Sequence, residues 1–551
     1  MKIDHRILSS LEKVFPDETP ACKNLKTISV LQGELLQFQW AICSCEGNRV
    51  ESCIRVDSIF KDNISLYEVG CVPSMLPAYA ESDNDFLRRS PGMYPDVLRP
   101  TGGTMSLVGG QWRSAWVEVA IPSNLCAGNY GIRLTLFSAQ NPDEVWAEAE
   151  ITVEVIGVTL PEQKLIYTNW FHCDCLALRY QVPVFSDEHW EIIRNYIKNA
   201  VRYGANMLLT PVFTPPLDTE VGGERPTVQL VGITWEEGKY HFDFVQLKRF
   251  MDLAWDCGIR YYEISHLFTQ WGAQHAPKIV IKENGQEKKR FGWYTDARSQ
   301  EYVSFINCFL LALKEHLKKE GRLDQCWFHI SDEPSVAALE SYRCARDSVR
   351  DILRDCRTMD ALSDIAFYKE GLVPHPIPST DHIDAFLEAN IPHLWTYYCC
   401  GQTVDVSNRM MAMPSVRNRI LGWQLYRYQI EGFLQWGYNF WFTFLSREFI
   451  DPYAVTDAGE MFPSGDAFIV YPGENGQPVS SIRQKVFYES LQDMRALQLL
   501  ETQIGREATV AWLEQECGSP LTFRQYPREA EWILQTREKL NRKIAENIVL
   551  K

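Results

Sequence analysis

The chain has 551 residues, of which 46% are hydrophobic, 12% aromatic and 23% charged. This is the composition of a globular protein, and it excludes disorder, collagen-like repeats and a coiled coil as the main architecture. Because 55 Lys and Arg face 71 Asp and Glu, the net charge is −16, which argues against nucleic acid or an anionic membrane surface as a partner. A single hydrophobic core stops growing at about 250–300 residues, so we expect at least two domains.

No targeting or membrane segment is visible in the sequence. The first residues lack the apolar stretch of a secretory signal, and no apolar run reaches the about 18 residues that span a bilayer. The 16 cysteines are scattered, and a chain of this length needs no disulfides, so reduced thiols are expected. We therefore expect a cytoplasmic protein without a membrane partner, or a secreted or periplasmic one if a leader was removed.

Residues 1–160 are expected to form an antiparallel β-sandwich. Short runs alternate apolar and polar residues, turn residues separate them, and no helical pattern lies between them. Residues 91–110 are rich in Gly and Pro and are expected to form a long loop. The predicted strands are residues 34–40, 115–121, 132–137 and 149–156.

Residues 161–500 alternate short buried strands with amphipathic helices. About eight such repeats favour a (β/α)8 TIM-type barrel over a doubly wound sheet. Residues 501–551 are expected to form a helical segment packed on the barrel, so the fold class is multidomain. The predicted strands are residues 165–170, 206–210, 261–265, 326–331, 361–364, 385–387, 393–397 and 438–442. The predicted helices are residues 187–203, 244–257, 299–319, 482–501 and 530–547.

The carboxyl ends of these strands carry acids, histidines and many aromatic residues, and barrel enzymes gather their chemistry at these ends. Sugars are recognised by aromatic rings under their C–H faces and by polar groups around their hydroxyls, so this rim predicts a carbohydrate site. For each single aromatic residue, packing in the barrel is the alternative. The candidate substrate-binding residues are Trp170, His172, Asp174, His266, Trp271, Trp395 and Trp441.

No metal or cofactor is expected. The cluster His172, Cys173, Asp174 and Cys175 lacks the paired spacing of zinc sites, and we expect Asp174 to contact sugar hydroxyls instead. The sequence also lacks a phosphate-binding glycine loop and the Gly-x-Ser-x-Gly turn of α/β-hydrolases.

The most specific feature is His-Ile-Ser-Asp-Glu-Pro at residues 329–334, at the end of the fourth predicted barrel strand. Two adjacent acids after a buried strand are costly unless they are paired or functional. Pro334 ends the strand, so the backbone can turn and bring Asp332 and Glu333 to the barrel mouth. Neighbouring carboxylates push their pKa values apart, so that one stays protonated near neutral pH. Capping of a helix that begins near Ser335 is the structural alternative.

An adjacent Asp-Glu pair fits substrate-assisted glycoside hydrolysis. Ordinary retaining glycosidases hold two carboxyl groups about 5 Å apart, commonly on different strands, and one of them is the nucleophile. In substrate-assisted hydrolysis the 2-acetamido oxygen of the sugar attacks instead. One acid then orients the amide, and the other is general acid and then general base. Since successive strand residues face opposite ways, only one of Tyr397 and Tyr398 is expected to bind the acetamide oxygen, and we prefer Tyr397.

Residues 160–500 resemble the catalytic domain of glycoside hydrolase family 123 and the related DUF4091 domains. The resemblance implies a β-N-acetylgalactosaminidase with an oxazoline intermediate, in which Asp332 orients the acetamide and Glu333 is the acid/base. The helices after residue 500 match no family pattern. The matching segments are residues 170–177, 329–334, 394–399 and 421–441 and, in the amino-terminal domain, 94–98 and 116–130.

The sequence thus predicts an exo-acting, retaining β-N-acetylhexosaminidase, and the resemblance implies that it prefers GalNAc. Its partner is a glycan or glycoconjugate with a terminal N-acetylhexosamine, and the sequence makes no prediction of the oligomeric state. Two alternatives stay open. One is a glycosidase for a non-acetamido sugar with Glu263 as nucleophile, and the other is a carbohydrate-binding protein without activity.

Overall fold

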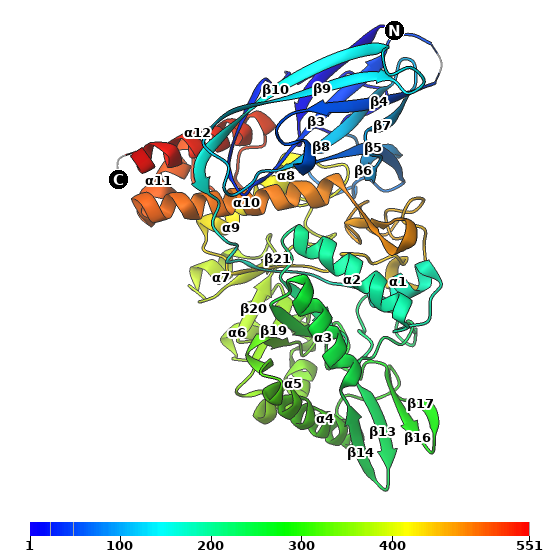
Figure 1. Ribbon diagram of the computed structural model, residues 1–551. Coiled ribbons are helices and arrows are strands. Elements are labelled where there is room, and N and C mark those ends of the chain that lie inside the picture. Colours follow the sequence, from blue (N-terminus) through cyan, green and yellow to red (C-terminus); the bar gives the residue numbers. More distant parts are fainter. Residues whose placement is uncertain (23, 48, 550–551) are drawn as a thin grey trace.

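The computed structural model describes residues 1–22, 24–47 and 49–549. In this part of the chain, an amino-terminal β-rich domain is followed by a nearly closed parallel barrel and three carboxyl-terminal helices (Figure 1). None of the described helices is long and apolar enough to cross a membrane. Because the β-rich domain and the barrel are built on separate sheets, the chain is multidomain, as predicted.

In its described residues, the amino-terminal domain consists of two five-stranded sheets. Ile42 and Val117 of one sheet and Ile54 and Leu134 of the other belong to one buried cluster, so the sheets share a core. The first sheet has the order β1 (Ile3–Ser9), β3 (Leu35–Ser44), β8 (Trp112–Ala120), β5 (Ile64–Ser74) and β6 (Gly92–Pro100). The second has the order β2 (Thr27–Gln32), β10 (Val145–Thr159), β9 (Gly128–Ser138), β4 (Val50–Asp57) and β7 (Thr104–Leu107).

Two details of this domain differ from the prediction. β2 pairs with β10 in parallel, so the second sheet is mixed rather than purely antiparallel. The predicted long loop at residues 91–110 contains β6 and β7. Both strands lie at a sheet edge, where a proline costs no ladder hydrogen bond, and Pro95 and Pro100 therefore fit within β6.

The barrel is a parallel sheet of eight strands within the described residues. A parallel bridge between Ser379 and Tyr397 joins its two outer strands, so the barrel is nearly closed. The order is β20 (His375–Pro378), β19 (Arg357–Leu362), β18 (Cys326–Phe328), β15 (Tyr261–Ile264), β12 (Met207–Thr210), β11 (Ile166–Asn169), β22 (Gly432–Gln435) and β21 (Trp395–Tyr397).

Two of the predicted barrel strands are wrong, and two strands of the barrel, β20 and β22, lie where none was predicted. Residues 385–387 lie in the helix α7 (Asp384–Glu388), and the strand of that repeat is β20. The His-Pro-Ile-Pro sequence of β20 gives no strand signal, but β20 lies at the open seam of the barrel, where its prolines are tolerated. Residues 438–442 are buried and apolar, yet they form only isolated bridges, such as Asn439 with Phe468, and the last barrel strand is β22.

The predicted long helices are all present. Ser186 and Ser299 cap α2 and α4 by accepting the backbone N–H groups of His189 and Tyr302. The helices before the carboxyl-terminal segment are α1 (Cys173–Tyr180), α2 (Asp187–Arg202), α3 (Val245–Cys257), α4 (Gln300–Lys319), α5 (Leu339–Leu353), α6 (Ala366–Lys369), α7, α8 (Ser415–Arg419) and α9 (Leu421–Arg427). Two hairpins, β13 (Gly232–Glu236) with β14 (Lys239–Asp243) and β16 (Ile279–Glu283) with β17 (Gln286–Phe291), extend from the end opposite the amino-terminal sheets (Figure 1). A small antiparallel pair, β23 (Val470–Pro472) and β24 (Pro478–Ser480), precedes α10.

The helix α10 (Ile482–Ile504) lies between the amino-terminal sheets and the barrel (Figure 1). The chain then forms α11 (Arg506–Cys517) and α12 (Ala530–Val549), and α12 packs against α10, β2 and β10. Buried ion pairs join α10 to the sheets: Asp96 of β6 with Arg483 at 2.9 Å, and Glu118 of β8 with Lys485 at 2.9 Å.

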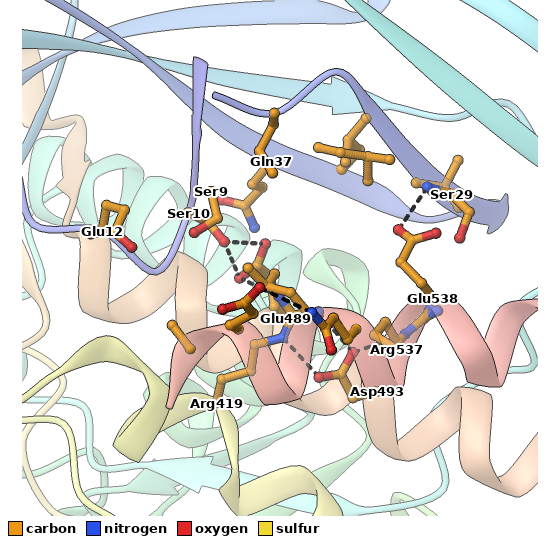
Figure 2. Close-up of a pocket in the computed structure, with 18 of the residues that line it drawn as sticks. Ser9, Ser10, Glu12, Ser29, Gln37, Arg419, Glu489, Asp493, Arg537 and Glu538 are labelled. Carbon is orange, nitrogen blue, oxygen red and sulfur yellow. Dashed lines mark hydrogen bonds and ion pairs between the residues drawn. The ribbon is translucent and has the colours of Figure 1, made fainter. Parts of the chain in front are cut away.

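A cavity of about 620 Å³ opens between β1, β2 and β3 and the helices α10 and α12 (Figure 2). A buried ionic network forms its floor. Asp493 pairs with both Arg419 and Arg537, and Arg537 also pairs with Glu34 of the loop before β3. This network ties the last helix to the first sheet.

Removing one member of this network is expected to destabilise the whole fold. Arg537→Met leaves Glu34 and Asp493 buried without one of their counter-charges, which costs about 3–5 kcal/mol for a buried pair. Urea unfolding followed by circular dichroism measures the loss. The matched control is Lys539→Met on the same helix, whose exposed pair with Glu516 is worth about 0–1 kcal/mol. Equal losses in both variants would contradict a stabilising role for the network.

Candidate active site

A cavity of about 220 Å³ opens at the carboxyl ends of the barrel strands. Five of the ten predicted site residues line it: Asp332, Glu333, Tyr397, Trp170 and Trp271. The lining also contains Leu217, Asp218, Gln270, Ala361, Cys399, Cys400, Leu434, Trp436, Phe444 and Phe462. A carboxylate pair in an aromatic cavity is thus present where the sequence placed it.

A tight turn after β18 presents both acids to the cavity. Glu333 has a φ of 40°, a left-handed conformation that is unusual for a residue other than glycine. Its backbone N–H donates to the carbonyl of Ala361 at 3.1 Å, which ties the turn to the end of β19. The following 3-10 turn (Val336–Ala338) has no side-chain cap, so the structure shows no helix-capping role for either acid.

The hydroxyl of Tyr397 donates a hydrogen bond to Oε1 of Glu333 at 2.5 Å. Burial raises the pKa of Glu333, and this hydrogen bond opposes part of that rise. Tyr397 is the last residue of β21 and points into the barrel mouth, whereas Tyr398 packs against Phe433 outside the cavity.

Burial also raises the pKa of Asp332 well above its ordinary value, and the nearby charge of Glu333 raises it further. Two acids that share one buried site do not both ionise easily, so the pair holds one proton over a broad pH range. Such a pair supplies one proton donor and one carboxylate side by side, which is the chemistry of general acid catalysis next to a charge-stabilising group.

A buried charged layer lies beneath the pair. The ring of His329 bonds Glu263 through Nε2 at 2.5 Å and Asp360 through Nδ1 at 3.0 Å. Burial would lower the pKa of His329, but these two bonds outweigh it and raise the pKa to about 10. Asp360 in turn accepts the backbone N–H groups of Ile330 and Ser331 at 3.0 and 3.3 Å. The layer therefore fixes the backbone that leads into Asp332.

Glu263, the alternative nucleophile, belongs to this layer. Its side chain is fully buried and accepts hydrogen bonds from Thr168 at 2.6 Å and Trp170 at 2.7 Å as well as contacting His329. It does not line the cavity. His266 stacks on His329 with ring centroids 4.2 Å apart and also lies below the cavity lining. Burial lowers the pKa of His266 well below its ordinary value, so its ring is neutral.

The structure does not bring His172 and Asp174 to the cavity. Asp174 forms a two-pronged ion pair with Arg225, with both N–O distances at 2.7 Å, and His172 contacts the same guanidinium at 3.1 Å. His172, Asp174 and Arg225 are thus engaged with one another, and none of the three lines the cavity. Among the described residues, no group of three or more His, Cys, Asp or Glu side chains could hold a metal ion.

Trp395 and Trp441 also lie outside the cavity lining. Trp395 shares a strand face with Tyr397 but lies one layer deeper, against Trp327 and Gly432. A Cβ at Gly432 would come within 1.9 Å of the Trp395 ring, so glycine is required there. Trp441 is fully buried against Tyr196. Both rings are core residues, the alternative that the sequence left open.

Sequence reasoning missed several residues of the lining. Asp218 follows β12, and Gln270 lies directly before the predicted Trp271. Trp436 follows β22 and donates from Nε1 to Asp466 at 2.9 Å. The strand end after β22 would have been a signal for Trp436 had that strand been placed correctly, whereas Asp218 and Gln270 lie in long loops without a local pattern.

Comparisons with known proteins agree with this geometry. The family model described as the catalytic domain of glycoside hydrolase 123 matches residues 170–500. A solved family 123 glycoside hydrolase from Clostridium perfringens, analysed for glycolipid glycan hydrolysis, is similar with a TM-score of 0.76 and 15% identity. The match covers 100% of this chain and 98% of that chain, and at this identity it shows the fold.

A β-glucuronidase from Parabacteroides merdae is less similar, with a TM-score of 0.32 and 11% identity over 89% of this chain and 52% of that chain. A similarity this low supports no conclusion about the site. Among curated protein sequences, none matches the chain.

Proposed function

Because the chain belongs to glycoside hydrolase family 123, we propose that it is a retaining exo-β-N-acetylhexosaminidase, with GalNAc as the preferred sugar, that uses substrate-assisted catalysis. The observation that carries the proposal is the adjacent pair Asp332 and Glu333 on one cavity wall, with the Tyr397 hydroxyl on Glu333. The substrate is then a glycan or glycoconjugate with a terminal N-acetylhexosamine.

The size of the cavity supports exo action. Its volume of about 220 Å³ is smaller than the about 300–1,000 Å³ of pockets for drug-sized ligands. A cavity of this size suits one terminal sugar ring rather than an internal stretch of glycan. The exposed ring of Trp271, 45% accessible at the cavity edge, is available to the sugar's C–H face or to the leaving group.

In the proposed first step, the acetamide oxygen of the bound sugar attacks the anomeric carbon while the glycosidic bond breaks. Glu333 gives its proton to the leaving oxygen, and Asp332 accepts the acetamide N–H and offsets the positive charge of the oxazoline ring that forms. The Tyr397 hydroxyl, which donates to Glu333 in the absence of substrate, turns toward the bound sugar and donates to its acetamide oxygen. In the second step the Glu333 carboxylate takes a proton from water, which attacks the anomeric carbon, so the configuration is retained.

The position of Glu263 argues against the alternative mechanism in which this residue is the nucleophile. Glu263 is buried under the cavity and fully engaged. Among the described lining residues, Asp218 is the remaining carboxylate, on a loop separate from that of the catalytic pair. A nucleophilic mechanism therefore predicts a covalent adduct on Asp218.

A direct test compares matched 4-nitrophenyl glycosides with a 2-acetamido or a 2-hydroxyl group, and incubates the enzyme with 2-deoxy-2-fluoro glycosides. Substrate assistance requires the acetamide as nucleophile, so the hydroxyl sugar is expected to be inert and intact mass to stay unchanged. Turnover of the hydroxyl sugar together with a stable adduct would refute the mechanism. Sugar binding without turnover of any glycoside would favour the carbohydrate-binding alternative.

Tyr397→Phe is expected to change both the rate and its pH dependence. Loss of the donor to the acetamide oxygen should lower kcat roughly a hundredfold. The lost hydrogen bond no longer opposes the raised pKa of Glu333, so that pKa rises further, and the alkaline limb of kcat/KM should move to higher pH.

The matched control is Tyr398→Phe, which removes a hydroxyl outside the cavity that has no hydrogen-bond partner in the described residues. This control should keep the wild-type pH profile. An unchanged alkaline limb in Tyr397→Phe would contradict coupling between Tyr397 and Glu333.

For the architecture, we propose a (β/α)8 TIM-type barrel joined to a β-sandwich, with domain limits at residues 1–160, 161–500 and 501–551. In support, at least one helix lies between each pair of consecutive barrel strands along the chain.

A further inference from the structure

Asp218 and Gln270 are held next to each other on the cavity wall. Gln270 is 5% exposed, and its Nε2 donates to the carbonyl of Thr219 at 3.0 Å, so its amide is anchored beside Asp218. Asp218 has a φ of 39° and accepts the backbone N–H of Leu445 at Oδ2 at 3.0 Å. Two separate loops thus place these side chains together on the lining.

Both side chains offer unused acceptors. With Nε2 bound to Thr219, the Gln270 oxygen Oε1 is buried without a donor among the described residues. In the same part of the chain, no group donates to Oδ1 of Asp218, the second carboxylate oxygen. A buried acceptor without a donor is destabilising, so a ligand that brings an O–H group gains binding energy by satisfying it.

The cavity lining is also acidic. Asp218, Asp332 and Glu333 line it, and none of the described lining residues is Lys, Arg or His. Two arginines of neighbouring segments are already paired, Arg225 with Asp174 and Arg447 with Glu220. A negative group on the bound sugar would therefore meet carboxylates and no basic side chain on the described lining.

We propose that Asp218 and Gln270 accept two hydroxyl protons of the bound sugar and make the site selective for an uncharged hexosamine over its sulfate and phosphate esters. This inference rests on the proposed function, because the sugar in question is the one whose glycosidic bond the Asp332–Glu333 pair cleaves. An ester replaces the donating hydroxyl by an acceptor and adds a negative charge, so it loses the hydrogen bond and is repelled.

Binding of free sugars tests this selectivity without relying on catalysis. N-acetylgalactosamine, N-acetylglucosamine and their 4-O- and 6-O-sulfates are titrated against the protein, and tryptophan fluorescence reports binding because Trp170, Trp271 and Trp436 line the cavity. We expect one neutral sugar to bind roughly a hundredfold more tightly than its sulfates, since like charges at close range repel each other.

Asp218→Asn should reduce the ratio of the affinity for the neutral sugar to that for its sulfates about tenfold. The substitution removes the negative charge and keeps an acceptor for the Leu445 N–H. Gln270→Met removes the free acceptor and keeps a side chain of similar length. It should weaken binding of the neutral sugar about tenfold, because one well-placed hydrogen bond is lost. The matched control is Glu188→Gln at the exposed start of α2, which changes the net charge equally and should keep the wild-type ratio.

Equal affinity for neutral and sulfated sugars, no binding of either neutral sugar, or an unchanged ratio in Asp218→Asn would overturn the inference. Hydrolysis of acetamido and hydroxyl glycosides reports the proposed function separately. If hydrolysis fails while the selectivity and its loss in Asp218→Asn are found, the proposed mechanism is refuted and the inference stands.

Discussion

Glu333→Gln is expected to lose about 10²–10⁴-fold in kcat on natural glycosides and much less on 4-nitrophenyl glycosides. A natural leaving group needs a proton as it departs, whereas 4-nitrophenolate leaves without one. The amide keeps the shape of the side chain and still accepts the Tyr397 hydrogen bond, so the loss reports the missing proton. The measurement is kcat for a series of leaving groups of decreasing pKa, which should give a steeper dependence in the variant than in the wild type.

The same variant should be more stable than the wild type at neutral pH. Burial raises the pKa of Glu333 in the folded state, so the stability of the wild type falls as pH rises from the ordinary glutamate value, about 4.3, through the raised value. The amide does not ionise and escapes this loss. The exposed control Glu188→Gln should keep the activity and should not be stabilised, because it only removes a charge at the start of α2 that is worth about 0.3–1 kcal/mol. Equal rate losses on good and poor leaving groups would show that Glu333 is structural.

Asp332→Asn is expected to lower kcat about 10²–10³-fold even on activated glycosides, the usual loss when one group that stabilises transition-state charge is removed. In the proposed mechanism the positive charge on the oxazoline develops whatever the leaving group is, so the loss should not depend on the leaving group. The two catalytic variants are therefore distinguished by their leaving-group dependence. Asp332 is buried with a raised pKa, so Asn should fold at least as stably.

A thiazoline analogue of the oxazoline is the second readout for Asp332. It resembles the intermediate and should bind the wild type far more tightly than the product sugar does. Asp332→Asn should lose most of that advantage, while Asp351→Asn, on the exposed face of α5, should keep it. Failure of the analogue to inhibit an active wild-type enzyme would eliminate the oxazoline route.

The acid pair could be predicted from the sequence because it breaks a pattern. A buried apolar strand followed at once by two acids and a proline is costly for packing, so the sequence favours a turn there that brings both acids to the barrel mouth. Regular periodicity likewise predicted α2, α3, α4, α10 and α12 to within a few residues. Such features are local, and local sequence determines them.

The rest of the site depends on contacts between distant segments. A hydrogen bond from the Leu445 N–H positions Asp218, and a hydrogen bond to the Thr219 carbonyl orients Gln270. Neither residue therefore shows a signal in its own segment of the sequence. The aromatic residues illustrate the same point. Trp395 and Tyr397 share one face of β21, and only the depth of each within the barrel makes one a core residue and the other part of the cavity.

The position of α10 has a consequence for how the molecule folds. Its Arg483 and Lys485 are counter-ions for Asp96 and Glu118, acids buried in the amino-terminal sheets, and Arg537 of α12 is the counter-ion for Glu34. If the first 160 residues were made alone, these acids would lose their cations, and the apolar surfaces of β6 and β8 would lose their cover. The two domains therefore form one cooperative unit, which should melt in a single calorimetric transition rather than in two.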